Sequence, residues 1–379
     1  MGETANLYVG MDVHKATVAI AVAEPGRSGE VRFIGNVDNK AAQIVSLLRK
    51  LEKKHGSIEC VYEAGPCAYT LYRAITAAGL TCIVVAPSKI PATPGHVKND
   101  HRDAVGLARL LRSGDVVPVW VPEPIHEAMR DLVRARHAAS FDLRKARQRL
   151  QSYLLLRDRL YPFKMWGTRH REWLRRQTFE HLAQQIAFQG YLHAMEQAEA
   201  RRKELEEQIA ILLPSWSLAP VVNAMLALRG VAPIIAVSIV AEIGDFARFA
   251  SPRQLMAYLG LIPGEHSSGG TIRTRGITKQ GNCVLRALLF EASWAYRFVP
   301  KVSVAMKARR PDGIAPAAID IAWKAQVRLC ARYRKLLAAG RRARLLSPQW
   351  LENFSGSSGL SPSQLNRCQR GRESPSRAS

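Results

Sequence analysis

The sequence predicts an α/β domain with a mixed sheet at the N-terminus, then a long helical hairpin and a mostly α-helical C-terminal domain. Three observations lead to this fold class. Over residues 7 to about 120, short apolar runs alternate with helical patterns. Between residues 125 and 213 the chain is dense in Arg, Glu and Gln with apolar residues at helical spacing. Beyond residue 214, compact apolar segments are broken by Pro and Gly.

The N-terminal elements follow a strand-first order. Three short runs joined by tight turns predict hairpin-style strands, and the β-α-β pattern after them predicts a mixed sheet flanked by helices. This order suits a ribonuclease-H-like core, in which Asp12 and Glu63 would come from adjacent central strands. We expect strands ending near residue 12 and at 17–23, 31–35, 58–62 and 81–86, and helices near 40–54 and 71–78.

Four acids stand in three local contexts that such a sheet would bring together. Asp12 lies at the end of the first apolar run, and Glu63 closes the run 58–62. Asp100 and Asp103 are three residues apart at the start of a predicted helix, so both carboxylates lie on one face of it. Carboxylates at two strand ends and a helix start are the hard oxygen ligands that Mg²⁺ takes, and a pair of such ions serves phosphodiester chemistry.

The helix acids also have ordinary structural explanations. Asp100 could cap the helix, and Asp103 could pair with Arg102 or Arg109 on its surface. For an isolated Asp-x-x-Asp these would be the better interpretations. The two strand-end acids change the balance, because an uncompensated carboxylate at a buried strand end is unfavourable.

Charge and composition indicate the class of partner. The chain has 55 Lys and Arg against 31 Asp and Glu, a formal net charge of +24 spread along 379 residues. Such an excess favours a polyanion, and nucleic acid more than a small metabolite. The 6 cysteines form no C-x-x-C pair, which argues against a structural zinc site or a secreted disulfide scaffold. No signal peptide is visible, and the longest apolar stretch, 231–239, is far shorter than a membrane helix. A soluble cytoplasmic protein without membrane contact is the expectation.

The charged middle segment predicts two long antiparallel helices, a coiled-coil hairpin joined by an aromatic-rich segment at 161–188. A spacer or dimerisation role is the simpler interpretation, direct contact with nucleic acid is the alternative, and both can hold together. Pro214 and Pro220 end the hairpin. The segment from Met225 resembles a helix-hairpin-helix element, whose turn presents backbone N–H groups to phosphate, but Ala232 stands where such turns carry a second glycine. A plain helix pair with a glycine turn fits equally well.

A glycine-rich segment at 257–282 carries two serines near three cations. These residues are Ser267, Ser268, Arg273, Arg275 and Lys279. A serine on a flexible loop with cations nearby can attack phosphorus, because the cations stabilise charge that develops on the phosphoryl oxygens. Taken alone, Ser-Ser-Gly-Gly also occurs in ordinary turns. His266 could serve as a base, although a loop histidine is usually just solvated.

Several motifs occur in a fixed order over about residues 7 to 340. They are Gly10-Met-Asp-Val-His-Lys, Tyr62-Glu-Ala-Gly, Lys98-Asn-Asp-His-Arg-Asp-Ala-Val-Gly-Leu-Ala-Arg-Leu-Leu, Val119-Trp-Val-Pro, and the segment Ala257 to Asn282 with Leu285-Arg. Together they resemble the DEDD-type insertion-sequence transposases, the insertion-sequence one-ten family. Several motifs together are far more specific than any one of them.

The resemblance implies a RuvC-like N-terminal nuclease domain, a coiled-coil hairpin and a C-terminal serine-containing transposase domain. Asp12, Glu63, Asp100 and Asp103 would hold Mg²⁺ at the scissile phosphate. Ser268, the serine directly before the glycine pair, would attack that phosphate to form a phosphoserine link to DNA, with Ser267 as the fallback.

The resemblance also implies partners. Members of the family read donor and target DNA by pairing with a structured bridge RNA, so the protein would bind RNA shape and DNA backbone rather than bases. Lys15, Arg273, Arg275 and Lys279 are the expected phosphate contacts. Assembly into a dimer or tetramer with composite sites is a further family expectation.

Other conspicuous side chains have simple interpretations. His14 and Lys15 match a family motif but need only form a turn or a phosphate contact. Trp120, Trp294 and Trp323 are expected to be core or packing residues.

The expected domains are 1–122 for the nuclease domain, 123–214 for the hairpin and 215–340 for the C-terminal domain. Beyond them the chain departs from the family, because a polar tail replaces the expected helix with Ala-Arg-Glu-Leu followed by Phe and Trp. A reading frame shifted by one base restores the missing residues. We therefore interpret 341–379 as frameshifted, disordered and without function.

Two rival functions are compatible with the sequence. A junction-resolving or other RuvC-like nuclease would use the four acids with water and need no serine. A decayed transposase remnant would bind nucleic acid with strong salt dependence but without Mg²⁺-dependent strand breakage.

Overall fold

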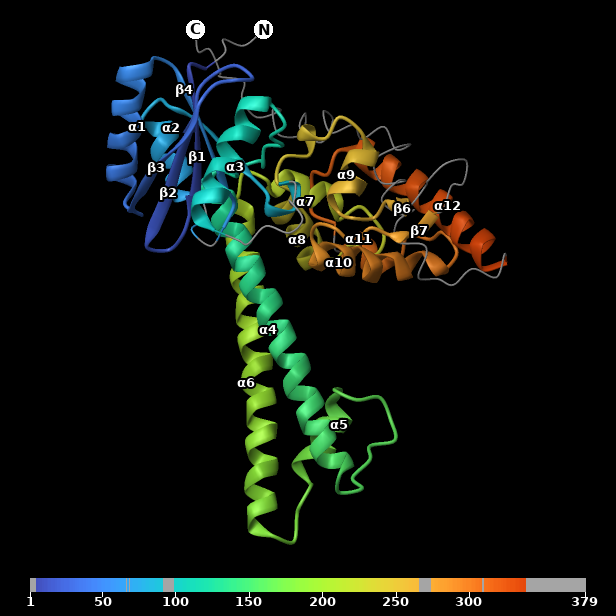
Figure 1. Ribbon diagram of the computed structural model, residues 1–379. Coiled ribbons are helices and arrows are strands. Elements are labelled where there is room, and N and C mark those ends of the chain that lie inside the picture. The colour runs from blue at the N-terminus through green and yellow to red at the C-terminus, as the bar shows by residue number, and fades with distance from the viewer. Residues whose placement is uncertain are drawn as a thin grey trace, which may run out of the picture. The chain divides into compact units, whose positions relative to one another are not determined.

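The computed structural model describes residues 5–65, 67, 69–90, 99–265, 274–308 and 310–338. The chain divides into two compact units, Met1–Pro122 and Glu123–Ser379 (Figure 1). The proposed tail at 341–379 lies outside the described residues. Within the described part of the chain, no single helix is long and apolar enough to cross a membrane, and one pair bent by 114°, Leu182–Ser215 with Ala219–Met225, passes only when taken together.

The first unit is built on a five-stranded mixed sheet with the strand order β3-β2-β1-β4-β5. Strand β1 pairs antiparallel with β2 and parallel with β4, β2 pairs antiparallel with β3, and β4 pairs parallel with β5. The predicted element order and mixed sheet are confirmed. The elements are β1 Leu7–Val13, β2 Thr17–Ala23, β3 Val31–Asp38, α1 Ala41–His55, β4 Ile58–Glu63, α2 Thr70–Ala77, β5 Thr81–Val85, the 3₁₀ turn η1 Pro87–Lys89 and α3 Asp100–Ser113.

Alternation along β1 divides its side chains between two cores. The odd-numbered residues from Leu7 to Val13 pack with α1 and α2, in a core that includes Ile44 and Ile75. The even-numbered residues face α3, as the packing of Tyr8 with α3 residues indicates. By this alternation Asp12 lies on the α3 face.

Gly10 determines how closely α3 approaches β1. A Cβ atom at Gly10 would stand 2.3 Å from the carbonyl oxygen of Ala104 and 2.4 Å from the backbone nitrogen of Ala108. Both are backbone atoms of α3, so a larger residue would push the helix away. The close approach brings the first turn of α3 to the end of β1, where Asp100 and Asp12 meet the same side chain, His14.

The second unit begins with a long helical hairpin, α4 Pro124–Leu155 and α6 Leu182–Leu212, which run side by side (Figure 1). Apolar side chains such as Leu150 and Phe188 fill the contact, and Arg136 pairs with Glu206 across it. The connection, 156–181, lies earlier in the chain than the predicted 161–188, because α4 ends at Leu155 and α6 begins at Leu182. Helix α5, Thr168–Arg175, lies within the connection.

The C-terminal part of the second unit packs around one apolar core. The almost entirely buried helix α8 contributes to it, as do Met129 and Val133 from the base of α4. Of the tryptophans predicted to be core or packing residues, Trp294 and Trp323 lie outside the buried core, at 38% and 41% exposed, and Trp294 packs against Phe290. The elements are η2 Leu213–Ser215, α7 Ala219–Met225, α8 Pro233–Ile243, η3 Phe246–Arg248, α9 Pro252–Tyr258, β6 Pro263–Glu265, β7 Thr274–Ile277, α10 Cys283–Ser293, η4 Trp294–Arg297, α11 Val304–Ala308 and α12 Pro316–Ala338.

The turn between α7 and α8 favours the plain helix pair over a phosphate-binding hairpin. Gly230 has a positive φ of 82°, and a Cβ atom there would stand 2.2 Å from the carbonyl oxygen of Ala292 in α10. Leu228 and Val231 beside it are buried. The glycine therefore serves packing against α10, although Gly230 itself is only half-buried and Pro233 is exposed.

Candidate functional site

The four predicted acids come from the carboxyl ends of two parallel strands and from the start of α3. The register of β1 with β4 pairs Met11 with Tyr62, so Asp12 and Glu63 are the next residue on each strand. Val61, two residues before Glu63, packs in the α3-facing core, which places Glu63 on the same face of the sheet as Asp12. Asp100 is the first residue of α3, and Asp103 lies in its first turn.

His14 joins two of these acids. Its Nε2 atom lies 3.1 Å from Oδ2 of Asp12 and 3.3 Å from Oδ1 of Asp100. The Nδ2 amide of Asn39 donates to the His14 carbonyl oxygen at 2.7 Å and holds the turn that carries the histidine. The sequence analysis identified His14 only by a motif match, so its contact with both acids is information from the fold.

Asn99, rather than Asp100, caps helix α3. The Oδ1 atom of Asn99 accepts a hydrogen bond from the backbone N–H of His101 at 3.0 Å. Asp100 is therefore not used as a cap, and among the described ion pairs Asp103 has none with Arg102 or Arg109. Both structural alternatives for the helix acids are wrong, and both carboxylates are left for another role.

Burial and like charges disfavour the ionised form of Asp12. The residue is only 9% exposed, and burial raises the pKa of its carboxyl group. The charges of Asp103 and Asp100 raise that pKa further, whereas His14 lowers it by charge and hydrogen bonding. A buried carboxylate facing two more carboxylates is the environment that a bound cation stabilises.

The donor set fits a hard divalent cation. Among the described residues, Asp12, His14 and Asp100 offer ligand atoms that all lie within 4.8 Å of one another. Glu63 and Asp103 lie outside this tight group, although they belong to the same face and the same helix turn. Carboxylate oxygens match Mg²⁺ or Mn²⁺ better than soft metals, and the imidazole is an additional donor that Mn²⁺ accepts readily.

The predicted serines lie outside the described residues, but the frame around them is defined. Strands β6 and β7 pair antiparallel on either side of 266–273, the segment that contains His266, Ser267, Ser268 and Arg273. Arg275 lies in β7, and Lys279 is exposed after it. The serine segment is therefore the connection of a two-stranded hairpin.

The base of this hairpin is fixed by Arg286 of α10. Its NH1 group donates to the carbonyl oxygens of Leu259, Gln280 and Gly281 at 3.0, 2.7 and 3.2 Å. A Cβ atom at Gly260 would stand 1.8 Å from the Gln280 carbonyl oxygen, so the two ends of the hairpin are in backbone contact.

A buried carboxylate ties the same region to the long hairpin. Glu242, 6% exposed, accepts two hydrogen bonds from Arg134 of α4 at 2.7 and 2.9 Å. It also accepts one from Asn282 Nδ2 at 2.9 Å, while Oδ1 of Asn282 caps α10. The sequence analysis missed this network. The available signal was Asn282 directly before an apolar helical run, a typical N-cap position.

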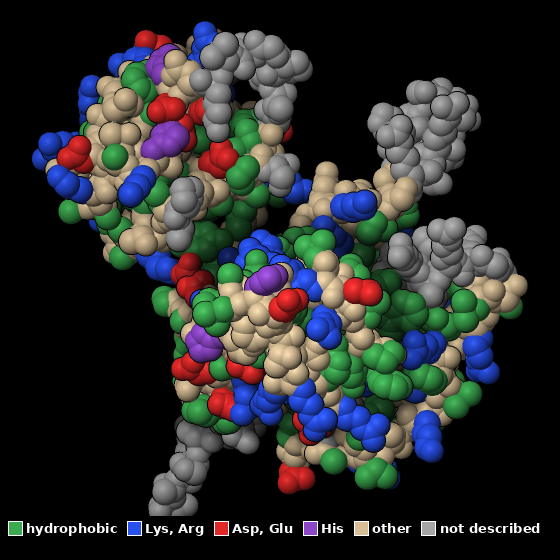
Figure 2. Space-filling view, turned by 90° about the horizontal axis from the view of Figure 1, so that it is seen from below, with side chains coloured by type: hydrophobic (Ala, Val, Ile, Leu, Met, Phe, Trp, Pro, Cys, Tyr) green, Lys and Arg blue, Asp and Glu red, His purple; other side chains and the backbone are tan. Residues whose placement is uncertain are grey.

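Positive charge is distributed over the surface. Lys and Arg side chains are spread over the visible face of the molecule and are not confined to one spot (Figure 2). This distribution accords with the formal net charge of +24 and favours a polyanionic partner.

Comparison with known proteins decides the family. A family profile described as "Transposase IS116/IS110/IS902 family" matches residues 222–304, and a DEDD transposase profile matches residues 9–157. The chain belongs to the IS116/IS110/IS902 transposase family. The first match contains both candidate serines, and the second contains all four acids.

Relatives match over most of this transposase. A Sinorhizobium fredii protein described as a transposase, y4qE, is 48% identical over 92% of this chain and 86% of its own. The transposase for insertion sequence element IS1533 of Leptospira borgpetersenii is 32% identical over 87% of this chain and 96% of its own. The chain is therefore an enzyme that acts on DNA.

Solved structures with local similarity are those of RuvC from Thermus thermophilus, alone and in complex with a Holliday junction substrate. Each covers 30% of this transposase and 99% of RuvC, with 12% sequence identity and a TM-score of 0.22.

Proposed function

We propose that this transposase cleaves and exchanges DNA strands in an Mg²⁺-dependent reaction that passes through a covalent serine–DNA link. The observation that supports the proposal is the close grouping of Asp12, His14 and Asp100, with Glu63 at the end of the adjacent strand β4 and Asp103 in the first turn of α3. The site belongs to a chain of a DNA transposase family, whose substrates contain the phosphodiester that such a site suits.

The four acids would hold Mg²⁺. The bound ion would supply electrophilic stabilisation of the phosphoryl oxygens and of the leaving oxygen. The chain itself holds the Asp12 carboxylate in a partly desolvated position, and Gly10 keeps α3 near enough for Asp100 to face Asp12. His14 fixes the relative orientation of Asp12 and Asp100.

Ser268 would be the nucleophile. Its oxygen would form a bond to phosphorus as the bond from phosphorus to a deoxyribose oxygen breaks, and the serine proton would pass by way of solvent to the released deoxyribose oxygen. The reaction exchanges one phosphodiester for another and consumes no water. Arg273, Arg275 and Lys279 would stabilise the negative charge on the phosphoryl oxygens, and Lys15 would contact a neighbouring phosphate.

The serine segment and the acids belong to different compact units, 1–122 and 123–379. We therefore propose that bound nucleic acid and a second protomer bring the two centres together. The assembly would be a dimer or tetramer, and the α4–α6 hairpin, as a coiled coil, would serve as spacer or dimerisation element. The second unit would comprise two functional domains, 123–214 and 215–340, followed by the functionless tail 341–379.

A structured bridge RNA encoded in the element would select donor and target DNA. The spread of positive charge supports this part of the proposal, because a protein that holds duplexes and folded RNA by their backbones needs many dispersed cations.

The test is strand cleavage by the full chain on DNA that carries the element ends, with RNA transcribed from the flanking noncoding DNA. Asp12→Asn should abolish Mg²⁺-dependent cleavage and spare nucleic-acid binding. Ser268→Ala should abolish the covalent product, with Ser267→Ala as its matched control. Full cleavage by Asp12→Asn would refute the metal assignment, and cleavage without any covalent product would favour hydrolysis by water.

A further inference from the structure

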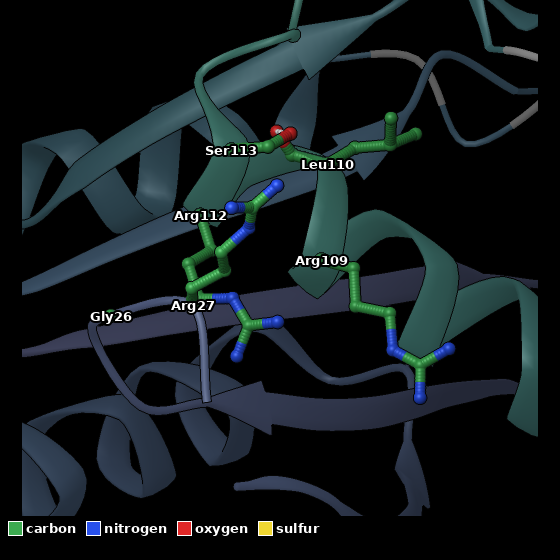
Figure 3. Close-up of a pocket in the computed structure, with 6 residues that line it drawn as sticks. All are labelled: Gly26, Arg27, Arg109, Leu110, Arg112 and Ser113. Atoms are coloured by element: carbon green, nitrogen blue, oxygen red, sulfur yellow. Dashed lines mark hydrogen bonds between the residues drawn. The ribbon is translucent and has the colours of Figure 1, made fainter. Parts of the chain in front are cut away.

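A second charged site lies on the first unit, away from the acids. A cleft of about 490 Å³ is lined by Gly26, Arg27, Arg109, Leu110, Arg112 and Ser113 (Figure 3). Arg109 and Arg112 come from the C-terminal half of α3, and Arg27 comes from the turn between β2 and β3.

This cleft is separate from the acid site. The turn that carries Arg27 follows Ala23, which pairs with Tyr8 near the start of β1, whereas Asp12 lies near the end of that strand. Four residues of strand correspond to roughly 13 Å. The two sites therefore lie at opposite ends of β1, and α3 contributes its first turn to one and its last turn to the other.

The three guanidinium groups have little anionic compensation. Arg112 is held in place by backbone, because its NH1 group donates to the carbonyl oxygens of Gly29 at 2.8 Å and Glu24 at 3.4 Å. Arg27 and Arg109 are exposed, and neither takes part in an ion pair among the described residues. The nearby carboxylates of Glu24 and Glu30 instead lie 4.0 and 3.8 Å from Arg32.

Like charges around one cleft repel one another unless an anion lies between them. Arginine is suited to phosphate, since its planar guanidinium can donate two parallel hydrogen bonds to phosphoryl oxygens. Gly26 leaves the wall open, because its φ is 82° and no atom lies within 4 Å of where a Cβ would stand. A polymer backbone can therefore approach the rim.

We propose that this cleft binds a backbone phosphate of a nucleic-acid strand, through Arg27, Arg109 and Arg112. The site is distinct from the contacts proposed at Lys15 and around the serine segment. This inference rests on the proposed function in one respect only, namely that the bound anion is a phosphodiester of nucleic acid. Because α3 also carries Asp100 and Asp103, a strand held here is tied to the same helix that forms the acid site.

The experiment measures binding of the full chain to labelled duplex DNA and to a labelled RNA hairpin by fluorescence anisotropy, over a range of NaCl concentrations. Arg27→Ala combined with Arg109→Ala should weaken binding and raise the Kd by about tenfold at 0.1 M salt. The slope of log K against log salt should become shallower by about 0.9 on duplex DNA, the value for one lost phosphate contact.

Lys53→Ala with Lys54→Ala is the matched control. It removes two exposed charges from the last turn of α1, which packs on the opposite face of the sheet. Arg27→Lys with Arg109→Lys should keep most of the slope and still lose affinity, because lysine retains charge without the two-pronged geometry.

A selective loss on DNA or on RNA supports the site and identifies the strand that it holds. Equal effects of the arginine and control variants on both nucleic acids would overturn it. The Mg²⁺-dependent thermal shift of the Arg27→Ala, Arg109→Ala variant should equal that of the unmodified chain. The loss of the Mg²⁺-dependent shift in Asp12→Asn alone reports on metal binding at the acid site and not on the arginine cleft. A failure of the proposed function and a failure of the proposed phosphate site are therefore distinguishable.

Discussion

Asp12→Asn tests whether the acid site is built for a cation, with a readout that does not depend on catalysis. The substitution removes the charge of a side chain that is 9% exposed, yet it preserves size and leaves an oxygen that can accept from His14. Burial and the charges of Asp103 and Asp100 disfavour the ionised carboxylate. Without divalent metal, the Asn variant should therefore be more thermally stable than the unmodified chain at neutral pH.

The pH dependence has a defined sign. The pKa of Asp12 is raised in the folded state, so the unfolded state loses its proton at lower pH than the folded state. The contribution of Asp12 to stability is full below its unfolded pKa and is lost as the pH rises through the raised folded value. The advantage of the Asn variant should thus be present at pH 7 and should shrink as the medium is acidified.

Divalent metal should reverse the order of stabilities. A site with a Kd of about 1 mM gains about 1.4 kcal/mol at about 10 mM Mg²⁺, because the ion binds only the folded state. For a unit the size of Met1–Pro122, with an unfolding entropy of about 2.1 cal/mol/K per residue, that gain corresponds to a rise in Tm of roughly 5 °C. Differential scanning fluorimetry with and without Mg²⁺ should record this rise for the unmodified chain and none for Asp12→Asn.

Glu59→Gln is the matched control. Glu59 lies on the same face of β4 as Glu63 but near the start of the strand. Burial raises the pKa of its carboxyl group. Its neutralisation should leave the response to Mg²⁺ intact. An equal Mg²⁺ response in the unmodified chain and in Asp12→Asn would refute the reasoning.

Three further predictions concern the framework. Gly10→Ala places a Cβ against the α3 backbone, which should destabilise the first unit by about 1–3 kcal/mol and remove the Mg²⁺ response, whereas Gly106→Ala, with open space around it, should be neutral or stabilising in thermal melts. Glu199→Gln breaks the ion pair with Arg171, whose hydrogen bond is the main cause of the lowered pKa of Glu199. The stabilisation of the fold by this ion pair is fully present above the ordinary glutamate pKa and is lost as the pH falls through the lowered value. At pH 7 the variant should therefore be less stable by about 1 kcal/mol, with a lower Tm, and the difference should vanish as the pH falls through the lowered pKa of Glu199. Truncation after Gly340 should leave the melting curve unchanged, and a cooperative loss of stability would show that the tail is structural.

The strand order and the position of the acids could be predicted because both follow from local patterns. Short continuous apolar runs are typical of strands buried on both faces of a sheet, and an acid at the end of each run falls at the carboxyl edge when the strands pair in parallel. The helix start at Asp100 follows from Asn99 as a capping residue, whereas the sequence analysis considered only Asp100 as a possible cap, as the alternative to its metal role.

Contacts between distant segments could not be predicted in this way. The position of His14 between Asp12 and Asp100 depends on the close approach of α3 that Gly10 permits. The exposure of Trp294 and Trp323 depends on which side of each helix faces the core. A single tryptophan carries no such information, since both sides of these helices contain apolar residues.

The most direct test of the central claim is to identify the residue bonded to DNA. The full chain would be incubated with element-end DNA, Mg²⁺ and the RNA of the flanking noncoding region, then digested and analysed by mass spectrometry. We predict a nucleotide attached through phosphate to the peptide at Ser268, absent from Ser268→Ala and from Asp12→Asn. Strand cleavage that yields only free phosphate ends, with no nucleotide on any serine peptide, would contradict the account.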